Sequence, residues 1–111
     1  MKKIGIIRCQ QTEDLCPGTT DFTCARAGTF AFAPFAPCEI VGFVSCGGCP
    51  GKHAVTRAKT LVDRGAEVVF LASCIGKGRP IDMPCPHAAA MKAAIEKKLG
   101  DAVPVIDGTH A

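Results

Sequence analysis

The chain has 111 residues, of which 48% are hydrophobic and 21% are charged, and its formal net charge is +3 at pH 7. This length and apolar content predict one domain, residues 1–111, with its own hydrophobic core. The basic residues are scattered and there is no Trp or Tyr on which bases could stack, so we expect no nucleic-acid partner.

The N-terminal segment MKKIGIIRCQ contains an apolar run that Arg8 interrupts after only four residues. That run is too short for a secretory signal, and no other segment reaches the length of a membrane span. We therefore expect a cytoplasmic protein with no membrane partner. Thiols are mostly kept reduced in the cytoplasm, so eight cysteines indicate metal or redox chemistry more than a disulfide framework.

Four short segments rich in β-branched and apolar residues are typical of parallel strands buried on both faces. They cover residues 3–8, 39–45, 67–73 and 103–107.

Helical patterns separate these strands. HAVTRAKTLVDRG and HAAAMKAAIEKKLG are amphipathic and end in Gly65 and Gly100. We expect a shorter helix near residues 21–31, with Thr20 or Asp21 as its N-cap. The alternation predicts a small open parallel α/β sheet of four strands, flavodoxin-like or Rossmann-like, with strand one interior and helices on both faces.

Cysteines follow the predicted strands. Cys9 comes after the first strand, Cys46 and Cys49 after the second and Cys74 after the third. Ligands of open parallel sheets bind outside the carboxyl ends of the strands, so we expect these thiols to share one site. Loop residues and the chain end complete the candidate ligand set, which is Cys9, Cys16, Cys46, Cys49, Cys74, Cys85, His87 and His110.

Two further cysteines, Cys24 and Cys38, are expected to be small core residues, because cysteine is among the most buried residue types. Cys38 also lies at the wrong end of its strand for the shared site. His53 is expected to face solvent at the start of its helix.

The segment VSCGGCPGKH, residues 44–53, supports several interpretations. Gly47 and Gly48 permit a sharp turn that presents both cysteines together, and the Cys-x-x-Cys spacing is used in zinc and iron–sulfur sites alike. A redox dithiol is the alternative, because Lys52 and a helix N-terminus would favour the thiolate. A phosphate-binding loop is disfavoured, because the spacing is one residue short and Pro50 lacks a backbone donor.

Four motifs together carry a resemblance: CGGCPGK, IIRCQQTEDLCPGTT, LASCIGKGRPIDMPCPH and DGTH. With Cys46-Gly-Gly-Cys49 and Cys85-Pro86-His87 in place, essentially the whole chain resembles the CGGC domain family, small proteins predicted to bind metal and found largely in anaerobic bacteria and archaea. The resemblance implies a metal site and slightly favours zinc over an iron–sulfur cluster.

Two functions therefore remain open. The first is a metal-binding protein, holding zinc or an iron–sulfur cluster, with a redox, metal-sensing or metal-handling role. The second is a thiol–disulfide oxidoreductase that uses Cys46 and Cys49. No serine triad, carboxylate pair or dinucleotide fingerprint indicates another enzyme class.

Overall fold

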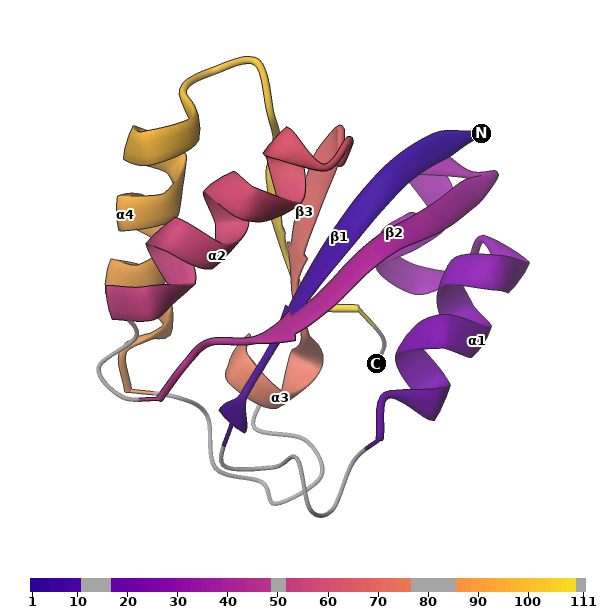
Figure 1. Cartoon of the computed structure of the whole chain (residues 1–111). Helices are drawn as coiled ribbons and strands as arrows, with labels where there is room; N and C mark the ends of the chain where they lie inside the picture. Colours follow the sequence, from indigo (N-terminus) through magenta and orange to yellow (C-terminus); the bar gives the residue numbers. More distant parts are fainter. Residues whose placement is uncertain (11–16, 49–51, 77–85, 110–111) are drawn as a thin grey trace.

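The computed structural model describes residues 1–10, 17–48, 52–76 and 86–109, with the backbone alone at residues 74 and 76. Its four strands are all parallel and form one sheet in the order β2-β1-β3-β4 (Figure 1). The predicted parallel sheet with an interior first strand is confirmed. The strands are β1 (Lys2–Arg8), β2 (Cys38–Ser45), β3 (Val68–Leu71) and β4 (Val105–Asp107).

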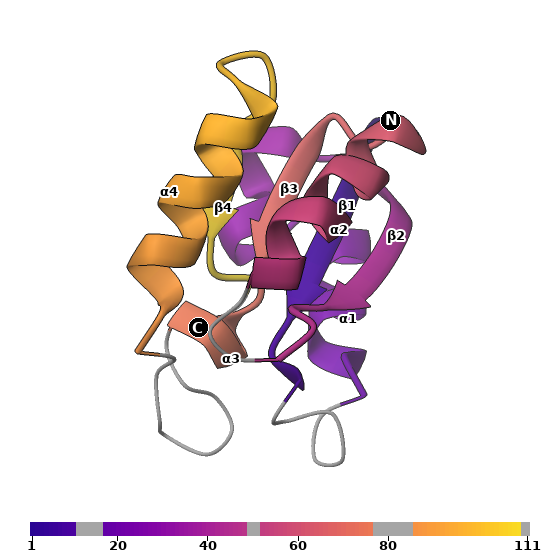
Figure 2. The ribbon, with the colours of Figure 1, turned by 60° about the vertical axis from the view of Figure 1, so that its left-hand side comes forward.

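Helices cover both faces of this sheet (Figures 1 and 2). Helices α2 (Lys52–Asp63) and α4 (Ala88–Leu99) pack against each other on one face. Helix α1 (Thr19–Ala27) and the 3-10 helix η2 (Phe30–Phe35) cover the other. This is the α/β architecture expected from the alternating pattern.

The first crossover differs from the predicted helix at residues 21–31. Helix α1 ends at Ala27 because Gly28 adopts a left-handed conformation (φ 70°), and its N–H donates to the carbonyl of Cys24 at 2.9 Å. The N-cap is Gly18, so the assignment of the cap to Thr20 or Asp21 was wrong. Asp21 instead lies buried in the first turn.

Strand lengths also differ from the sequence expectation. The third strand covers only Val68–Leu71, because the chain turns after Ala72 into a short helix, α3 (Ser73–Gly76). The fourth begins at Val105 rather than Val103. Strand β2 is half-buried along most of its length instead of buried on both faces, because it is an edge strand with a neighbour on one side only.

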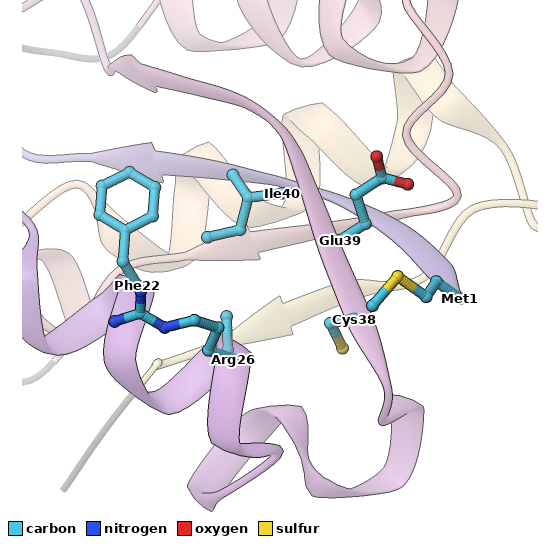
Figure 3. A pocket seen from close by; sticks show the side chains of 7 residues that line it. Met1, Phe22, Arg26, Cys38, Glu39 and Ile40 are labelled. Atoms are coloured by element: carbon cyan, nitrogen blue, oxygen red, sulfur yellow. The ribbon is translucent and has the colours of Figure 1, made fainter.

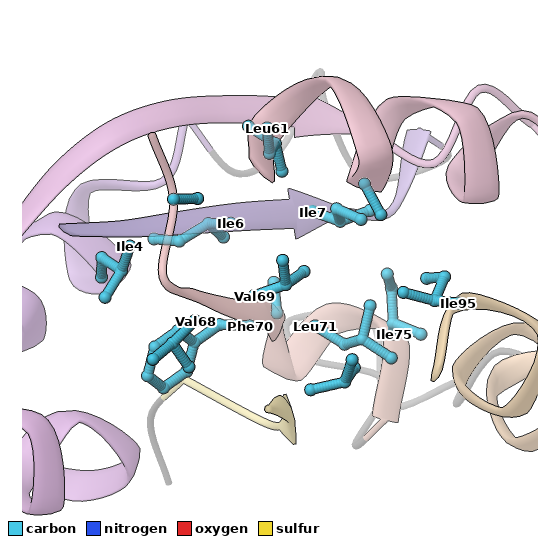
Figure 4. Packing of buried hydrophobic residues seen from close by; sticks show 14 of the residues in the cluster. Ile4, Ile6, Ile7, Leu61, Val68, Val69, Phe70, Leu71, Ile75 and Ile95 are labelled. Atoms are coloured by element: carbon cyan, nitrogen blue, oxygen red, sulfur yellow. The ribbon is translucent and has the colours of Figure 1, made fainter. Parts of the chain in front are cut away.

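The core lies around the two central strands (Figure 4). Ile4, Ile6 and Ile7 of β1 are fully buried, as is every residue of β3. Burial of each such aliphatic side chain stabilises the fold by roughly 1.5–3 kcal/mol. Across the sheet, Phe70 of β3 contacts Phe32 of η2, with ring centroids 4.4 Å apart, so the side bearing η2 has an aromatic core.

A pair of glycines lets helix α2 approach the sheet closely. Gly5 of β1 pairs with Gly42 of β2, and Leu61 of α2 lies directly over both. A Cβ atom on Gly42 would lie 2.3 Å from Leu61 Cδ2, and one on Gly5 would lie 2.9 Å from Leu61 Cδ1. Any side chain at Gly42 would therefore require Leu61, or the helix that carries it, to move.

Within the described ranges, no helix is both long and apolar enough to cross a membrane.

Candidate functional site

The strands end, and helices α1, α2 and α4 begin, at one side of the sheet, here called the carboxyl edge (Figures 1 and 2). At this edge Arg8 of β1 is the register partner of Ser45 of β2. The N–H of Cys46 donates to the carbonyl of Arg8 at 2.7 Å, so Cys9 and Cys46 follow the ends of neighbouring strands. Cys9 is half-buried, and Cys46 is a free thiol that is only 5% exposed.

The other neighbour of β1 is β3, and the N–H of Ala72 donates to the carbonyl of Ile7 at 2.8 Å. Cys74 belongs to α3, which starts one residue after Ala72. The chain runs from β1 outward to β2 and then returns to β3 on the opposite side of β1. Such a reversal of strand order marks the position at which open α/β sheets bind ligands, and Cys9 and Cys74 flank it.

His87 is the N-cap residue of α4 and is half-buried. Four other candidate ligands, Cys16, Cys49, Cys85 and His110, lie outside the described residues, as does the side chain of Cys74. The described residues alone contain no group of three or more His, Cys, Asp or Glu side chains arranged to hold a metal ion. The full ligand set therefore stays a prediction.

The glycines of the central motif have the expected backbone. Gly47 and Gly48 have φ values of 82° and 99°, a region that side chains disfavour. There is also no room for a side chain at Gly47, because a Cβ atom there would lie 2.4 Å from His53 Cβ. The first residues of this loop thus pack against the start of α2.

Two side chains that the sequence did not single out hold the loop to that helix. Arg57 Nη1 donates to the Ser45 carbonyl at 3.1 Å and to Ser45 Oγ at 2.9 Å. Ser45 Oγ in turn accepts the Gly47 N–H at 3.3 Å. Arg57 looks in the sequence like an ordinary polar-face residue of an amphipathic helix, so no local signal distinguishes it.

Positive charge also lies at this edge. Arg8 is only 7% exposed, its Nε donates to the Cys9 carbonyl at 3.3 Å, and its guanidinium lies 6.0 Å from the centre of the Phe43 ring. Lys52 and His53 are exposed in the first turn of α2. Arg8 and Lys52, together with the positive ends of the helix dipoles, favour anionic groups at the carboxyl edge.

A buried polar cluster was missed in the sequence. Asp21 is 3% exposed, and Ser73 and Thr109 are fully buried. The Thr109 hydroxyl donates to Asp21 Oδ1, the Thr109 N–H donates to Ser73 Oγ at 3.0 Å, and the Ser73 N–H donates to Thr109 Oγ1 at 3.2 Å. Their only sequence signal was the position of Ser73 and Thr109 immediately before candidate ligands.

The two cysteines expected in the core lie there, with Cys24 5% and Cys38 7% exposed. Cys38 pairs with Lys2 where the strands begin, at the end of the sheet opposite the carboxyl edge. Burial raises the pKa of the Cys38 thiol. It lines an open pocket of about 250 Å³ with Met1, Phe22 and Ile40, which is mostly apolar and lies where the strands begin (Figure 3).

Fold and site together define a small parallel α/β domain with cysteines and buried positive charge at its carboxyl edge. The model of the CGGC domain matches residues 3–110, and the chain belongs to this family. Membership of this cysteine-rich family supports a metal-binding role in general terms, without specifying a metal.

Two relatives come from Methanocaldococcus jannaschii. The uncharacterized protein MJ0582 is 33% identical over 116 aligned residues, which cover 97% of this chain and 86% of the relative. The uncharacterized protein MJ0766 is 42% identical over 55 residues, covering 49% of this chain and 79% of the relative. No solved structure matches the chain.

Proposed function

We propose that the protein binds zinc or an iron–sulfur cluster through cysteine and histidine side chains gathered at the carboxyl edge. The observation that carries the proposal is the placement of Cys9 and Cys46 after hydrogen-bonded ends of neighbouring strands, beside the reversal of strand order. Cys74 lies in α3, which follows β3, the other neighbour of β1. Candidate ligands far apart in the sequence thus start from one edge.

The chemistry of these donors fits such a group. Thiolates and imidazoles are the usual zinc ligands, and four thiolates hold most iron–sulfur clusters. Cys46 is a free thiol rather than half of a disulfide, so it is available for ligation.

The surrounding charge supports thiolate ligation. Several thiolates bring net negative charge to one place, and its burial is costly unless positive charge lies nearby. Arg8 places a largely buried guanidinium next to Cys9, and α2 begins three residues after the Cys-x-x-Cys motif. When bound, zinc would supply a structural or Lewis-acid centre, and an iron–sulfur cluster would supply one-electron redox chemistry.

The experiment is anaerobic purification followed by metal analysis and a visible absorption spectrum. Iron with sulfide and a brown colour would identify a cluster, whereas a colourless sample containing stoichiometric zinc would identify a zinc site. Cys46→Ser and Cys49→Ser should each release or strongly weaken the metal. Cys24→Ser is the matched control, because that thiol is equally buried but belongs to the core. Full metal occupancy in both motif variants would refute the proposal.

The same preparation tests the dithiol alternative, in which one thiolate attacks a disulfide and the other resolves the mixed disulfide. The 5% exposure of Cys46 argues against Cys46 as the attacking thiol, because attack needs access to the substrate sulfur. A metal-free protein that reduces disulfides, and that traps a covalent adduct when one motif cysteine is replaced, would favour the oxidoreductase.

A further inference from the structure

The Asp21–Ser73–Thr109 cluster joins three distant parts of the chain at the carboxyl edge. Asp21 belongs to α1, Ser73 opens α3, and Thr109 lies two residues beyond the end of β4. The sequence separations are 36 residues between Ser73 and Thr109 and 88 residues between Asp21 and Thr109. The cluster therefore joins α1, α3 and the segment after β4, which are too far apart in the sequence for a local turn to join them.

Its hydrogen bonds restrict position more than an apolar contact would. Ser73 and Thr109 are bonded reciprocally, each backbone N–H donating to the hydroxyl oxygen of the other residue. The Thr109 hydroxyl has a further bond to the carboxylate of Asp21, which orients that hydroxyl. Hydrogen bonds are directional, whereas hydrophobic contacts depend mainly on buried area. The backbone at both residues is held in two directions at once.

Because the cluster is buried, its polar atoms must find their hydrogen-bond partners within the protein. Asp21 is 3% exposed and both hydroxyl residues are fully buried, so loss of one member leaves polar atoms without solvent to replace it. Throughout the described part of the chain, every buried side-chain nitrogen or oxygen has a hydrogen-bond partner. Apolar residues would fill this position more simply if packing were the only need.

We propose that this cluster is a positioning device for the ligand-bearing backbone at the carboxyl edge, an inference that rests on the proposed metal-binding function. Ser73 immediately precedes Cys74, and Thr109 immediately precedes His110. Ala72, one residue before Ser73, is bonded to β1 two residues before Cys9. The cluster thus sets where the first turn of α3 lies relative to the end of β1. Hydrogen-bonded groups behind metal ligands act in this way, and their loss typically weakens metal binding by 10–100-fold.

The test compares Thr109→Val, which keeps the shape but removes the hydroxyl, with Thr109→Ser, which keeps both polar groups. Ile4→Val is the matched control, because Ile4 is fully buried near the start of β1, far from the carboxyl edge. Cobalt(II) is titrated anaerobically into each metal-free protein, and affinity and the thiolate–cobalt spectrum are recorded. We expect Thr109→Val to bind cobalt about 10-fold more weakly, or worse, with an altered spectrum. Thr109→Ser and Ile4→Val should resemble the unmodified protein.

A second measurement needs no metal. Dibromobimane links two nearby thiols, and mass spectrometry of peptides measures how fast it joins Cys9 to Cys74 in the metal-free chain. We expect the link to form several-fold more slowly in Thr109→Val than in Ile4→Val. Should Thr109→Val fail to fold, Ser73→Ala takes its place, because it removes the acceptor of the Thr109 N–H.

The two measurements separate the two proposals. If the unmodified chain binds no metal but cross-linking depends on Thr109, the metal-binding proposal fails and the positioning role stands. If metal binds and Thr109→Val matches Ile4→Val in both cobalt spectrum and cross-linking rate, the positioning role is refuted. The cluster would then contribute only to stability.

Discussion

Replacing Gly47 by Ala should destabilise the protein for two separable reasons. An alanine at φ 82° costs about 1–2 kcal/mol in the left-handed region. The new Cβ atom would also lie 2.4 Å from His53 Cβ, and relief of such overpacking typically costs about 1–3 kcal/mol. The substitution also reduces the conformational freedom of the unfolded chain, which stabilises the folded state by about 0.4–1 kcal/mol. The sum is a loss of roughly 1–5 kcal/mol.

Gly48→Ala is the matched control for this prediction. Gly48 has φ 99°, so it shares the backbone cost, but a Cβ atom there would lie 3.5 Å from Gln10 Oε1, an ordinary contact. In urea unfolding, the free energy of unfolding of Gly48→Ala should therefore be about 1–3 kcal/mol higher than that of Gly47→Ala, which is the size of the overpacking cost. His53→Ala should not rescue Gly47→Ala, because the contact is with Cβ, whereas His53→Gly should. Equal destabilisation by the two glycine variants would refute the packing of the loop against α2.

Three further predictions concern positions away from the loop. Cys38 should react with iodoacetamide more slowly than Cys9 at the same pH, because burial restricts access and raises its pKa; peptide mass spectrometry measures both rates, and equal rates would contradict this. The pKa of Glu67 is lowered, chiefly because its carboxylate accepts a backbone N–H of β1, so its contribution to stability is present at neutral pH and lost as pH falls through that lowered pKa. Glu67→Gln should lose less stability than the unmodified chain between about pH 5 and pH 3 in thermal melts, and parallel curves would refute this. Gly42→Ala should cost about 1–3 kcal/mol in urea unfolding, and addition of Leu61→Ala should make the cost of Gly42→Ala smaller; a fully additive double variant would exclude the contact.

The sheet was predictable because its signals are local. Runs such as KIGIIR and EVVFLAS combine β-branched residues with burial on both faces, which few structures other than a central parallel strand accommodate. Helices α2 and α4 have clear amphipathic patterns and glycine stops. The left-handed backbone at Gly47 and Gly48 also followed from the residue type.

The features that were missed depend on contacts between distant segments. Asp21 has the side chain of a good helix cap, but its bond to Thr109 in the folded chain prevails over that local preference. Helix α3 spans only Ser73–Gly76, too short to leave a periodic pattern. The half-exposure of β2 follows from its place at the edge of the sheet, which the strand's own residues do not encode.

Of the candidate site, the sequence predicted which strands carry cysteines, and the parallel topology places Cys9 and Cys46 together at one edge. It did not predict the supporting contacts from Arg8, Arg57 and Thr109. Arginine and threonine are common on surfaces, so only three-dimensional proximity distinguishes a supporting role from an ordinary solvent-exposed one.

Helix α2 is held against glycine backbone at both of its ends. Leu61 rests on the pair formed by Gly5 and Gly42, and His53 rests on Gly47, eight residues or about 12 Å earlier along the helix axis. A helix of this length behaves as a stiff rod, so lifting one end tilts the other. An added carbon on Gly42 that displaced Leu61 together with its helix would therefore also shift the cysteine loop. A substitution at Gly42, which touches no candidate ligand, would in that case change the position of the central motif through the far end of the helix.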